Sequence, residues 1–374
     1  MRSVSPKVGL FAVASVLLTI CVPLGAPAAS AGTGTCSFSV VKAAKPGTYA
    51  DLVDLTSLAA DNVWAVGSDL QRRLQVPLVE HWDGRAWSQV PAPNPGVKGG
   101  VLRKVSASSP NDVWAVGTYY TQGKTGNGLV EHWDGNSWSV VQTPRLPRWN
   151  DFMGVSADSP SDVWIVGSQG ATTPRGFNPV IEHWNGTTWS ITRGRERTPD
   201  VGTAVDVAAR SPTDVWVVGS DERANFIEHW NGSRWRIQFS TSKSYITSVS
   251  AVGWAVADRF TESPLTLRRN GTSWVAVPTP HLHARTMDPA RISGSRKSNV
   301  WLVGRVLIQE EKPLIEHWNG TRWSVVTIPH APKGSQSDGL LGVTVGSTGQ
   351  VWAVGSYWNA QRDESIPLVY QRTC

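Results

Sequence analysis

The amino-acid sequence predicts an all-β protein, a seven-bladed β-propeller with four-stranded antiparallel blades. Three observations predict it. A unit of about 50 residues recurs seven times along the chain. Each unit contains four short runs rich in β-branched and aromatic residues, separated by turn residues. The last unit lacks its fourth run, and the region near the N-terminus can supply it. Four-stranded units repeated around an axis form a propeller, with each unit a blade.

The most constant part of the unit is a V-W-A-V-G block, which we expect to form the second strand of each blade. It recurs at 62–67, 112–117, 162–167, 214–219, 253–257, 299–304 and 350–355. The third strand reads L-V-E-H-W and the fourth W-S-x-V. An Asp-Gly or Asn-Gly pair between them predicts a tight hairpin, because both residues tolerate positive φ. Of the 20 Trp, all except Trp149 and Trp358 fall on repeat positions, so the architecture explains most of the aromatic content.

The two ends of the repeat region complete one blade. Residues 367–374 align with a third strand, and residues 36–41 align with the fourth strand at 136–141. The N-terminal strand is therefore predicted to complete blade 7. In this alignment Cys36 and Cys374 occupy neighbouring positions of one hairpin turn, which predicts a disulfide between them in an oxidising compartment. Closing a loop of about 340 residues contributes about 5–6 kcal/mol in the chain-entropy model.

The N-terminus is typical of a secretory signal peptide, which we assign to residues 1–31. Arg2 and Lys7 precede an apolar run at 8–24, and small residues lead to a predicted cleavage site after Ala31. Lipidation at Cys21 is the alternative; the bulky residue before that Cys argues against it. The remaining chain, 32–374, is predicted to be a single propeller domain that is secreted to the extracellular space.

Composition excludes two classes of partner. The formal net charge is +6, and removal of Arg2 and Lys7 with the signal peptide lowers it to +4. Charges of both signs are spread along the chain, so no nucleic-acid partner is expected. No later apolar run approaches the ~20 residues of a membrane span, so none is predicted.

The sequence carries no set of residues that indicates catalysis. Five Glu and five His recur at the E-H-W position of the third strand, where we expect structural hydrogen bonds. His281 and His283 form an H-x-H pair without a third ligand, so no metal site is assigned. Nucleophile elbows, phosphate-binding loops and HExxH motifs are absent from the sequence. We therefore predict no enzyme and no cofactor; an unrecognised secreted enzyme is the least supported alternative.

The residues that break the repeat indicate where a ligand binds. In a four-stranded meander, the loops joining strands two and three and those joining successive blades lie on one face, and these are the loops that vary. Exposed aromatic side chains there are natural platforms for a sugar ring or a partner's apolar anchor. The predicted ligand-binding residues are Trp149, Trp358, Tyr119, Tyr120, Tyr357, Arg148, Asn150, Asp151, Asn359 and Asp363. The competing interpretation is that these loops vary without constraint and their aromatics fold back over a blade edge.

Two further features of the sequence are the charged residues of the first strands and the irregular fifth blade. First-strand residues Asp54, Lys104, Asp206 and Arg291 are expected in the axial channel, where their mixed signs favour mutual pairing. Blade 5 has a shortened first turn and reads L-T-L-R-R in place of L-V-E-H-W. Its departure from the repeat is either decay or a docking surface.

The V-W-A-V-G and E-H-W-D-G blocks, with a Trp three residues after the second Gly, resemble kelch-type propellers of the galactose-oxidase kind. The stretch 346–355, GSTGQVWAVG, resembles tectonin repeats of tachylectin-like propellers. The first resemblance implies protein binding and the second sugar binding. The resemblance to secreted bacterial propellers of this type also implies a role as the lectin or adaptor part of a larger secreted toxin complex. A copper site is not implied, because both Cys are committed to the disulfide. The two hypotheses are a non-catalytic lectin-like module that recognises cell-surface or cell-wall glycan, and a propeller that docks a secreted or cell-surface protein.

Overall fold

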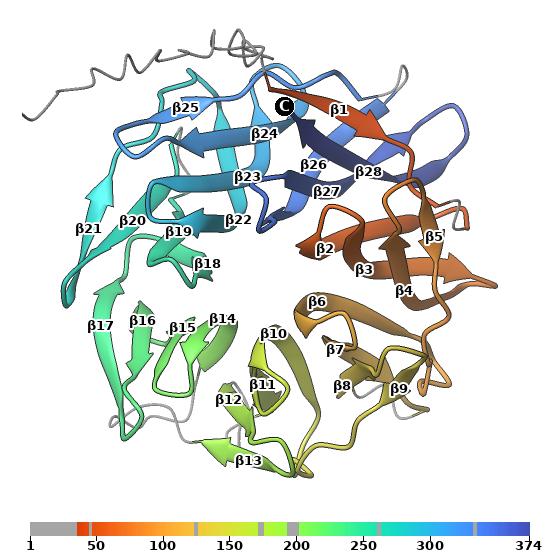
Figure 1. The fold of residues 1–374 in the computed structure, drawn as a ribbon, viewed down its shortest axis with the longest axis vertical. Helices are drawn as coiled ribbons and strands as arrows, with labels where there is room; N and C mark the ends of the chain where they lie inside the picture. The colour runs from red at the N-terminus through yellow and green to blue at the C-terminus, as the bar shows by residue number, and fades with distance from the viewer. Residues whose placement is uncertain are drawn as a thin grey trace, which may run out of the picture. The chain divides into compact units, whose positions relative to one another are not determined.

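The protein forms a closed ring of seven four-stranded antiparallel sheets in a computed structural model (Figure 1). The structure describes residues 36–44, 47–122, 126–170, 176–192, 202–259, 263–331 and 335–374. The predicted signal peptide, residues 1–31, lies outside the described residues. All regular elements of the described residues are strands, so the predicted seven-bladed β-propeller is confirmed. No helix in this part of the chain is both long and apolar enough to cross a lipid bilayer.

Six blades are built from four consecutive strands, called a to d from the ring axis outwards. Blade 1 contains β2 (Ala50–Ala59), β3 (Asn62–Gln71), β4 (Leu74–Trp82) and β5 (Trp87–Gln89). Blade 2 contains β6 (Gly100–Ser109), β7 (Asp112–Tyr120), β8 (Gly126–Trp133) and β9 (Trp138–Val140). Blade 3 contains β10 (Asn150–Ser159), β11 (Asp162–Gly170), β12 (Phe177–Trp184) and β13 (Trp189–Thr192).

The next three blades repeat this order. Blade 4 contains β14 (Gly202–Ser211), β15 (Asp214–Asp221), β16 (Asn225–Trp230) and β17 (Trp235–Thr241). Blade 5 contains β18 (Tyr245–Ser250), β19 (Trp254–Asp258), β20 (Leu265–Asn270) and β21 (Ser273–Val277). Blade 6 contains β22 (Thr286–Arg296), β23 (Asn299–Leu307), β24 (Glu311–Trp318) and β25 (Trp323–Val325).

Blade 7 closes the ring with strands from both ends of the described chain. It contains β26 (Ser335–Val345), β27 (Val351–Asn359), β28 (Glu364–Thr373) and, as strand d, β1 (Ser37–Val41). In Figure 1, β1 (red) lies beside β28 (dark blue), and Ser37 pairs with Thr373 in the antiparallel register. A disulfide joins Cys36 to Cys374 across 338 residues of sequence, with the two Cα atoms 4.0 Å apart. Both the predicted closure and the predicted disulfide are confirmed.

One side-chain oxygen in most blades organises the Trp of strand b and the His of strand c. In blade 2, Asp112 Oδ1 accepts a hydrogen bond from Trp114 Nε1 at 2.9 Å and lies 2.8 Å from His132 Nε2. The His132 ring packs on Trp114 with 4.2 Å between centroids. The equivalent oxygens in blades 3, 4 and 6 belong to Asp162, Asp214 and Asn299. The repeated His therefore has the structural role expected of it.

The same strand-b Trp joins each blade to the next. Trp114 of blade 2 contacts Trp184 and Trp189 of blade 3, with ring centroids 6.1 and 5.7 Å apart. Blades 5 and 7 lack the strand-c Trp and carry Arg there instead. The Arg269 guanidinium lies 4.6 Å from the centre of the Trp216 ring, and that of Arg372 lies 5.2 Å from Trp301. Cation–π contacts thus replace the missing Trp contacts, so blade 5 keeps the packing between blades despite its aberrant sequence.

The turns between strands c and d differ from expectation in one respect. Gly84 has positive φ, at 93°, but Asp83 does not share it. Four residues separate the paired Trp82 and Trp87, so the loop is longer than a two-residue hairpin. Asp83 Oδ1 accepts hydrogen bonds from the backbone N–H groups of Arg85 and Ala86. Asn185, Asn231 and Asn319 make the same bonds in their blades.

The repeated Glu of strand c does not make the hydrogen bonds expected of it. Glu131, Glu182 and Glu316 are fully buried, and neither carboxyl oxygen of any of them has a hydrogen-bond partner among the described residues. Burial raises the pKa of each to about 8. Glu80 accepts one hydrogen bond from Ala44 N–H, and burial raises its pKa to about 7. Removal from water disfavours the charged form, so Glu131, Glu182 and Glu316 are more protonated at neutral pH than Glu80.

These glutamates make the stability of the propeller fall as pH rises. Between the unfolded pKa of about 4.5 and the folded pKa of about 8, the folded state binds more protons than the unfolded state, so alkalinity favours unfolding. We expect the melting temperature to drop by several degrees from about pH 5.5 to about pH 8.5, within the window these pKa values define. Glu131→Gln removes one titrating group and should make this drop smaller. Glu310→Gln, at an exposed carboxylate, is the control and should leave it unchanged. An unchanged drop in Glu131→Gln would contradict the burial argument.

Candidate functional site on the variable face

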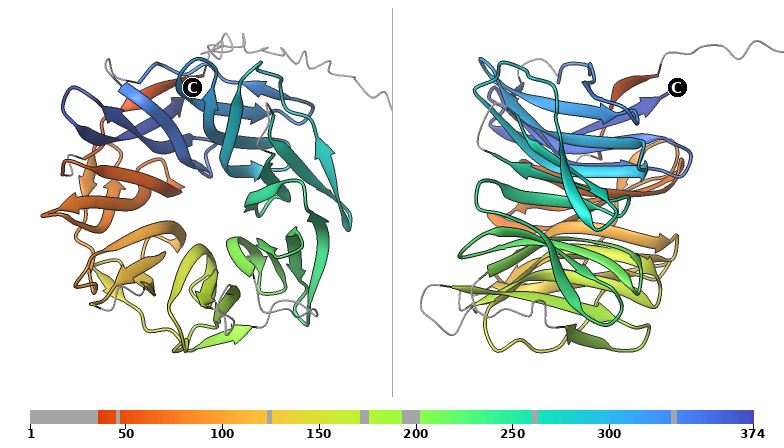
Figure 2. Two further views of the ribbon diagram at one scale, coloured as in Figure 1. Left: turned by 180° about the vertical axis from the view of Figure 1, so that it is seen from behind. Right: turned by 90° about the vertical axis from the view of Figure 1, so that its left-hand side faces the viewer.

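The ring presents two faces of different character. The variable face carries the b–c loops and the connections between blades, and the turn face carries the a–b and c–d turns. The edge-on view in Figure 2 places the C-terminus on the turn face, where β28 ends. Variation in loop sequence is thus gathered on one side of a rigid scaffold, the arrangement typical of binding surfaces.

A bulge in strand a of every blade exposes one extra residue toward the axis of the variable face. The pairing of strands a and b skips Val53, Arg103, Met153, Val205, Thr247, Ala290 and Leu341. An ideal Cβ on Gly117 would collide with the carbonyl oxygen of Val101. The Gly that ends the V-W-x-V-G block therefore leaves room for the bulge. Because bulges re-aim side chains, this position can differ from blade to blade without disturbing the core.

Five of the seven bulged residues line a cavity of about 500 Å³, which we call the axial funnel. Its wall combines the apolar side chains of Val53, Met153, Ala290 and Leu341 with the guanidinium of Arg103. Ser68, Gln75 and Tyr120 also line it. These residues come from blades 1, 2, 3, 6 and 7, so the cavity spans the ring rather than one blade.

A buried network of charged groups lies next to the bulged residues. Asp206 receives Lys104 Nζ at 2.9 Å and Arg291 Nη1 at 3.1 Å, and it also accepts hydrogen bonds from Ser248 and Val249. Arg291 Nε lies 3.5 Å from Asp54, whose carboxylate accepts the Val105 N–H. The predicted mutual pairing of the four axial residues is confirmed. Burial opposes the charge on Lys104, but Asp206 and Asp54 outweigh it and raise its pKa.

Arg103 gives the funnel a surplus positive charge. The two acidic and two basic axial side chains balance one another, whereas Arg103 is exposed and has no ion-pair partner among the described residues. A guanidinium in this setting favours a carboxylate or phosphate group on a ligand, which it can bind through two parallel hydrogen bonds.

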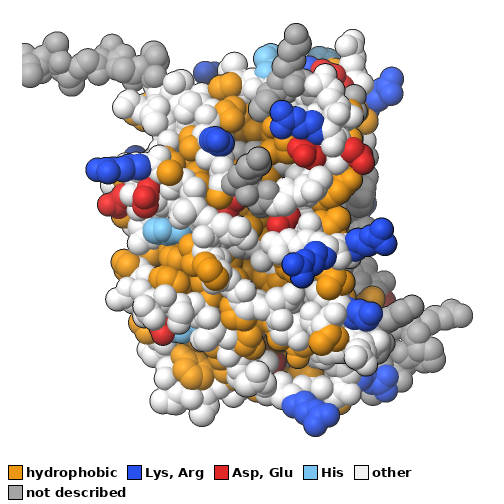
Figure 3. Space-filling model, turned by 90° about the vertical axis from the view of Figure 1, so that its right-hand side faces the viewer, with side chains coloured by type: hydrophobic (Ala, Val, Ile, Leu, Met, Phe, Trp, Pro, Cys, Tyr) orange, Lys and Arg blue, Asp and Glu red, His pale blue; other side chains and the backbone are white. Residues whose placement is uncertain are grey.

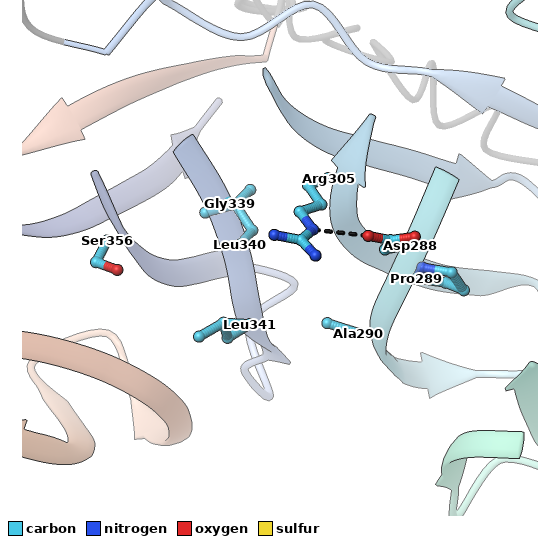
Figure 4. Close-up of a pocket in the computed structure, with 8 residues that line it drawn as sticks. All are labelled: Asp288, Pro289, Ala290, Arg305, Gly339, Leu340, Leu341 and Ser356. Carbon is cyan, nitrogen blue, oxygen red and sulfur yellow. Dashed lines mark hydrogen bonds and ion pairs between the residues drawn. The ribbon is translucent and has the colours of Figure 1, made fainter. Parts of the chain in front are cut away.

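A second hollow, of about 350 Å³, adjoins the funnel between blades 6 and 7 (Figure 4). Ala290 and Leu341 line both cavities. Arg305 Nε makes an ion pair with Asp288 at 2.7 Å, and its Nη1 lies 3.5 Å from Glu311. The charge of Arg305 is therefore already balanced, and this hollow adds apolar surface and Ser356 to the binding face.

The predicted residues of blade 3 form an exposed aromatic platform. Trp149 is 38% exposed and packs edge-to-face against Phe177, itself 43% exposed, with centroids 5.0 Å apart. Asn150 Oδ1 accepts the Gly128 N–H, and Asp151 Oδ1 accepts the hydroxyl of Ser168. Both polar side chains hold the loop in place, which leaves the two aromatic rings and the exposed Arg148 to face solvent.

The predicted residues of blade 7 have structural contacts instead. Trp358 packs against Tyr49 with 5.8 Å between centroids, and the Tyr49 hydroxyl donates to Asp363 at 3.1 Å. Asn359 accepts backbone hydrogen bonds from residues 361 and 362. Tyr357 is buried and lines a cavity of about 550 Å³ between β1, β28 and the start of the chain leading to blade 1. These residues join blade 7 to blade 1.

The structure thus divides the ten predicted residues among three blades. Tyr120 lines the funnel, whereas Tyr119 packs against the core of blades 1 and 2. Sequence reasoning missed Arg103, Gln75 and Phe177. Arg103 had a detectable signal, because its position varies from unit to unit, whereas the position before it stays apolar in every unit. Phe177 had none, since it begins strand β12 and its contact partner Trp149 lies in the connection before β10.

Comparisons with known proteins concern the fold. No family model and no curated protein sequence matches the chain. The structure of YCF48 bound to D1 peptide is similar with a TM-score of 0.58 and 16% identity, covering 90% of this chain and 96% of that one. The six-bladed fucose-recognising lectin of Aleuria aurantia gives 0.49 and 13% identity, covering 77% and 100%. SapL1 lectin in complex with alpha methyl fucoside gives 0.48 and 12%, covering 76% and 98%. The likeness to the YCF48 structure, at 16% identity, shows a shared fold alone and says nothing about the ligand of this chain.

The described residues contain no cluster of three or more His, Cys, Asp or Glu side chains arranged to hold a metal ion. His281 and His283 lie side by side, with the His283 N–H directed at His281 Nδ1. The two His side chains alone are too few to form a metal site of the usual three or four protein ligands.

Asp206 is the hub of the axial network, and its replacement should destabilise the ring. Asp206→Asn leaves Lys104 and Arg291 buried without full compensation, which typically costs about 3–5 kcal/mol. We expect a loss in that range in urea unfolding. Asp288→Asn removes a partly exposed ion pair and serves as control, with an expected loss of under about 1 kcal/mol. Equal losses in the two variants would show that the axial network is not a buried, coupled unit.

Proposed function

We propose that this protein is a non-catalytic extracellular binding module that recognises glycan through its variable face. The observation that carries the proposal is the exposed pair formed by Trp149 and Phe177 on blade 3. The flat faces of sugar rings stack on exposed aromatic side chains, and an edge-to-face pair holds such a platform rigid. Most other Trp side chains of the chain are engaged in joining blades, so this exposed pair is an exception to the repeat.

The axial funnel supports a ligand that carries negative charge. Its volume of about 500 Å³ falls within the range of small-ligand pockets, and its wall mixes apolar side chains with a few polar groups. Figure 3 views the outer side of blades 7, 1 and 2, with the turn face at left; Lys and Arg side chains gather toward the variable face at right. Together with Arg103, this charge favours glycans bearing carboxylate groups, such as uronic acids.

A protein partner is the second candidate function. The funnel and the adjoining hollow between blades 6 and 7 offer apolar surface, including Leu341, which is 40% exposed. An acidic segment of a secreted or cell-surface protein fits the same combination of apolar wall and guanidinium. Membership of a larger secreted complex would follow from such a partner.

A glycan array that includes neutral and uronic-acid-containing oligosaccharides tests the proposal. We expect binding to a restricted set of glycans, with Trp149→Ala weakening the affinity about tenfold, equivalent to about 1.4 kcal/mol. Trp358→Ala is the matched control, because its ring packs on Tyr49, and its affinity should stay within about twofold, or 0.4 kcal/mol.

An array without binding would overturn the glycan proposal, as would unchanged affinity in Trp149→Ala for every bound glycan. Binding of a secreted protein that is lost in Arg103→Gln, together with an empty array, would establish the second candidate in its place.

A further inference from the structure

The turn face carries a separation of charge that neither the repeat nor the proposed function explains. The a–b and c–d turns lie within the described residues, whereas the residues before Cys36, which is joined to Cys374 at this face, lie outside them. On blades 1 to 3 it exposes an acidic arc, which consists of Asp61, Asp83, Asp134 and Asp158. On blades 4 and 6 it exposes a basic arc, which consists of Arg234, Arg236, Arg296, Lys297 and Arg322. The ring places the two arcs on opposite sides of the axis (Figure 1).

Most other charged side chains of this face have structural partners among the described residues. Asp112, Asp162 and Asp214 bind the Trp and His of their own blades. Arg268, Arg269 and Arg372 lie over Trp rings, and Arg210 pairs with Asp214. None of the five basic-arc side chains makes an ion pair with the described residues. Among the described residues, Arg85 is the only Lys or Arg in the turns of blades 1 to 3 on this face. The two arcs are therefore free to meet charges outside the molecule.

Hydrogen bonds in the c–d turns stabilise the charged form of two side chains of the acidic arc. Backbone N–H groups of the c–d turns donate to Asp83 and Asp134 and hold the pKa of both carboxyl groups below the usual range. The arcs therefore present opposite fixed charges on one surface. Such a surface is self-complementary: a two-fold axis in the plane of the face, between the arcs, lays each arc on the opposite arc of a second copy.

We propose that the turn face is an interface for a second copy of this chain, in a two-fold, face-to-face dimer held by the acidic and basic arcs. Both arcs are then matched, and the variable faces point outwards on the two sides of the dimer. A polyanion is the competing partner. It would match the basic arc but meet repulsion from the acidic arc on the same face, so the separation of charge favours the second copy.

Sedimentation velocity of the secreted protein at low and high salt tests the proposal. The screening length falls from about 20 Å in about 20 mM salt to about 4 Å in about 500 mM salt, so exposed ion pairs hold only at low salt. We expect a concentration-dependent dimer at low salt and a monomer at high salt. A monomer at both salt concentrations would overturn the proposal.

The repeat itself supplies variants that remove charge without disturbing the fold. Other blades carry neutral residues at the same positions, so each arc residue can take the residue of another blade. Asp83→Asn with Asp134→Asn removes two of the four charges of the acidic arc and keeps the turn hydrogen bonds that Asn185 makes in blade 3. Arg234→Ser with Arg322→Ser removes two of the five charges of the basic arc and places there the residue that blade 2 has at Ser137. Each pair should weaken dimerisation at least about tenfold with melting temperatures unchanged. Unchanged dimerisation in both would overturn the proposal.

Charge reversal separates the second copy from a polyanion. Asp61→Lys with Asp158→Arg, added to Asp83→Asn with Asp134→Asn, removes all four acidic-arc charges and makes the whole face basic. Arg234→Glu, Arg236→Glu and Arg322→Glu together turn the net charge of the basic arc negative and make the face acidic. Each reversed protein alone should be monomeric at low salt, and their mixture should form a heterodimer. Heparin serves as the polyanion probe. If the wild-type protein is monomeric and binds heparin, and the all-basic variant binds it more tightly, the partner of this face is a polyanion and the dimer proposal is overturned. Glycan recognition by the variable face is measured at low salt on each charge-reversed protein alone, so the two proposals fail independently.

Discussion

The contact between the strand-b Trp of one blade and the outer strands of the next is the interaction on which the ring depends. Each blade alone is a small twisted sheet with a face that it cannot bury. Trp114 is held by Asp112 and His132 of its own blade and packs against Trp184 of the next. These four repeat residues of two adjacent blades thus form one joint. Where strand c has lost its Trp, as at Arg269, a guanidinium takes the same place over the ring.

This constraint separates structure from function. Repetition around the ring accounts for residue types that are often catalytic elsewhere, such as the buried Glu and the paired Asp and His. The residues that take no part in the contacts between blades and that vary from blade to blade lie in three places. These are the bulged positions of strand a, the loops of the variable face and the exposed charged residues of the turn face. The buried Glu carries a cost that varies with pH, since each remains neutral only while its raised pKa lies above the surrounding pH.

The sequence was sufficient to predict the fold, because the same residues recur at the same positions of each unit. It predicted seven blades, completion of blade 7 by residues 36–41, the disulfide and the pairing of Lys104 with axial carboxylates. The sequence was insufficient to predict the site, because the site depends on local changes in backbone direction and on contacts between residues far apart in the sequence. A bulge turns Arg103 toward the axis. Trp149, in the connection before β10, packs against Phe177 at the start of β12. Tyr49, which precedes blade 1, packs on Trp358 of blade 7. The separation of charge on the turn face emerges only when turns distant in sequence are placed around one ring.

The joint between blades 4 and 5 offers the most direct test of the account. Arg269 occupies the position that Trp holds in other blades, beside Trp216. Restoring the aromatic residue with Arg269→Trp should leave the free energy of unfolding within about 1 kcal/mol of the natural protein, whereas Arg269→Ala should lower it by about 1–2 kcal/mol, the value of a partly desolvated cation–π contact. Equal losses in the two variants would contradict the claim that one conserved joint, filled by Trp or by Arg, holds the blades together.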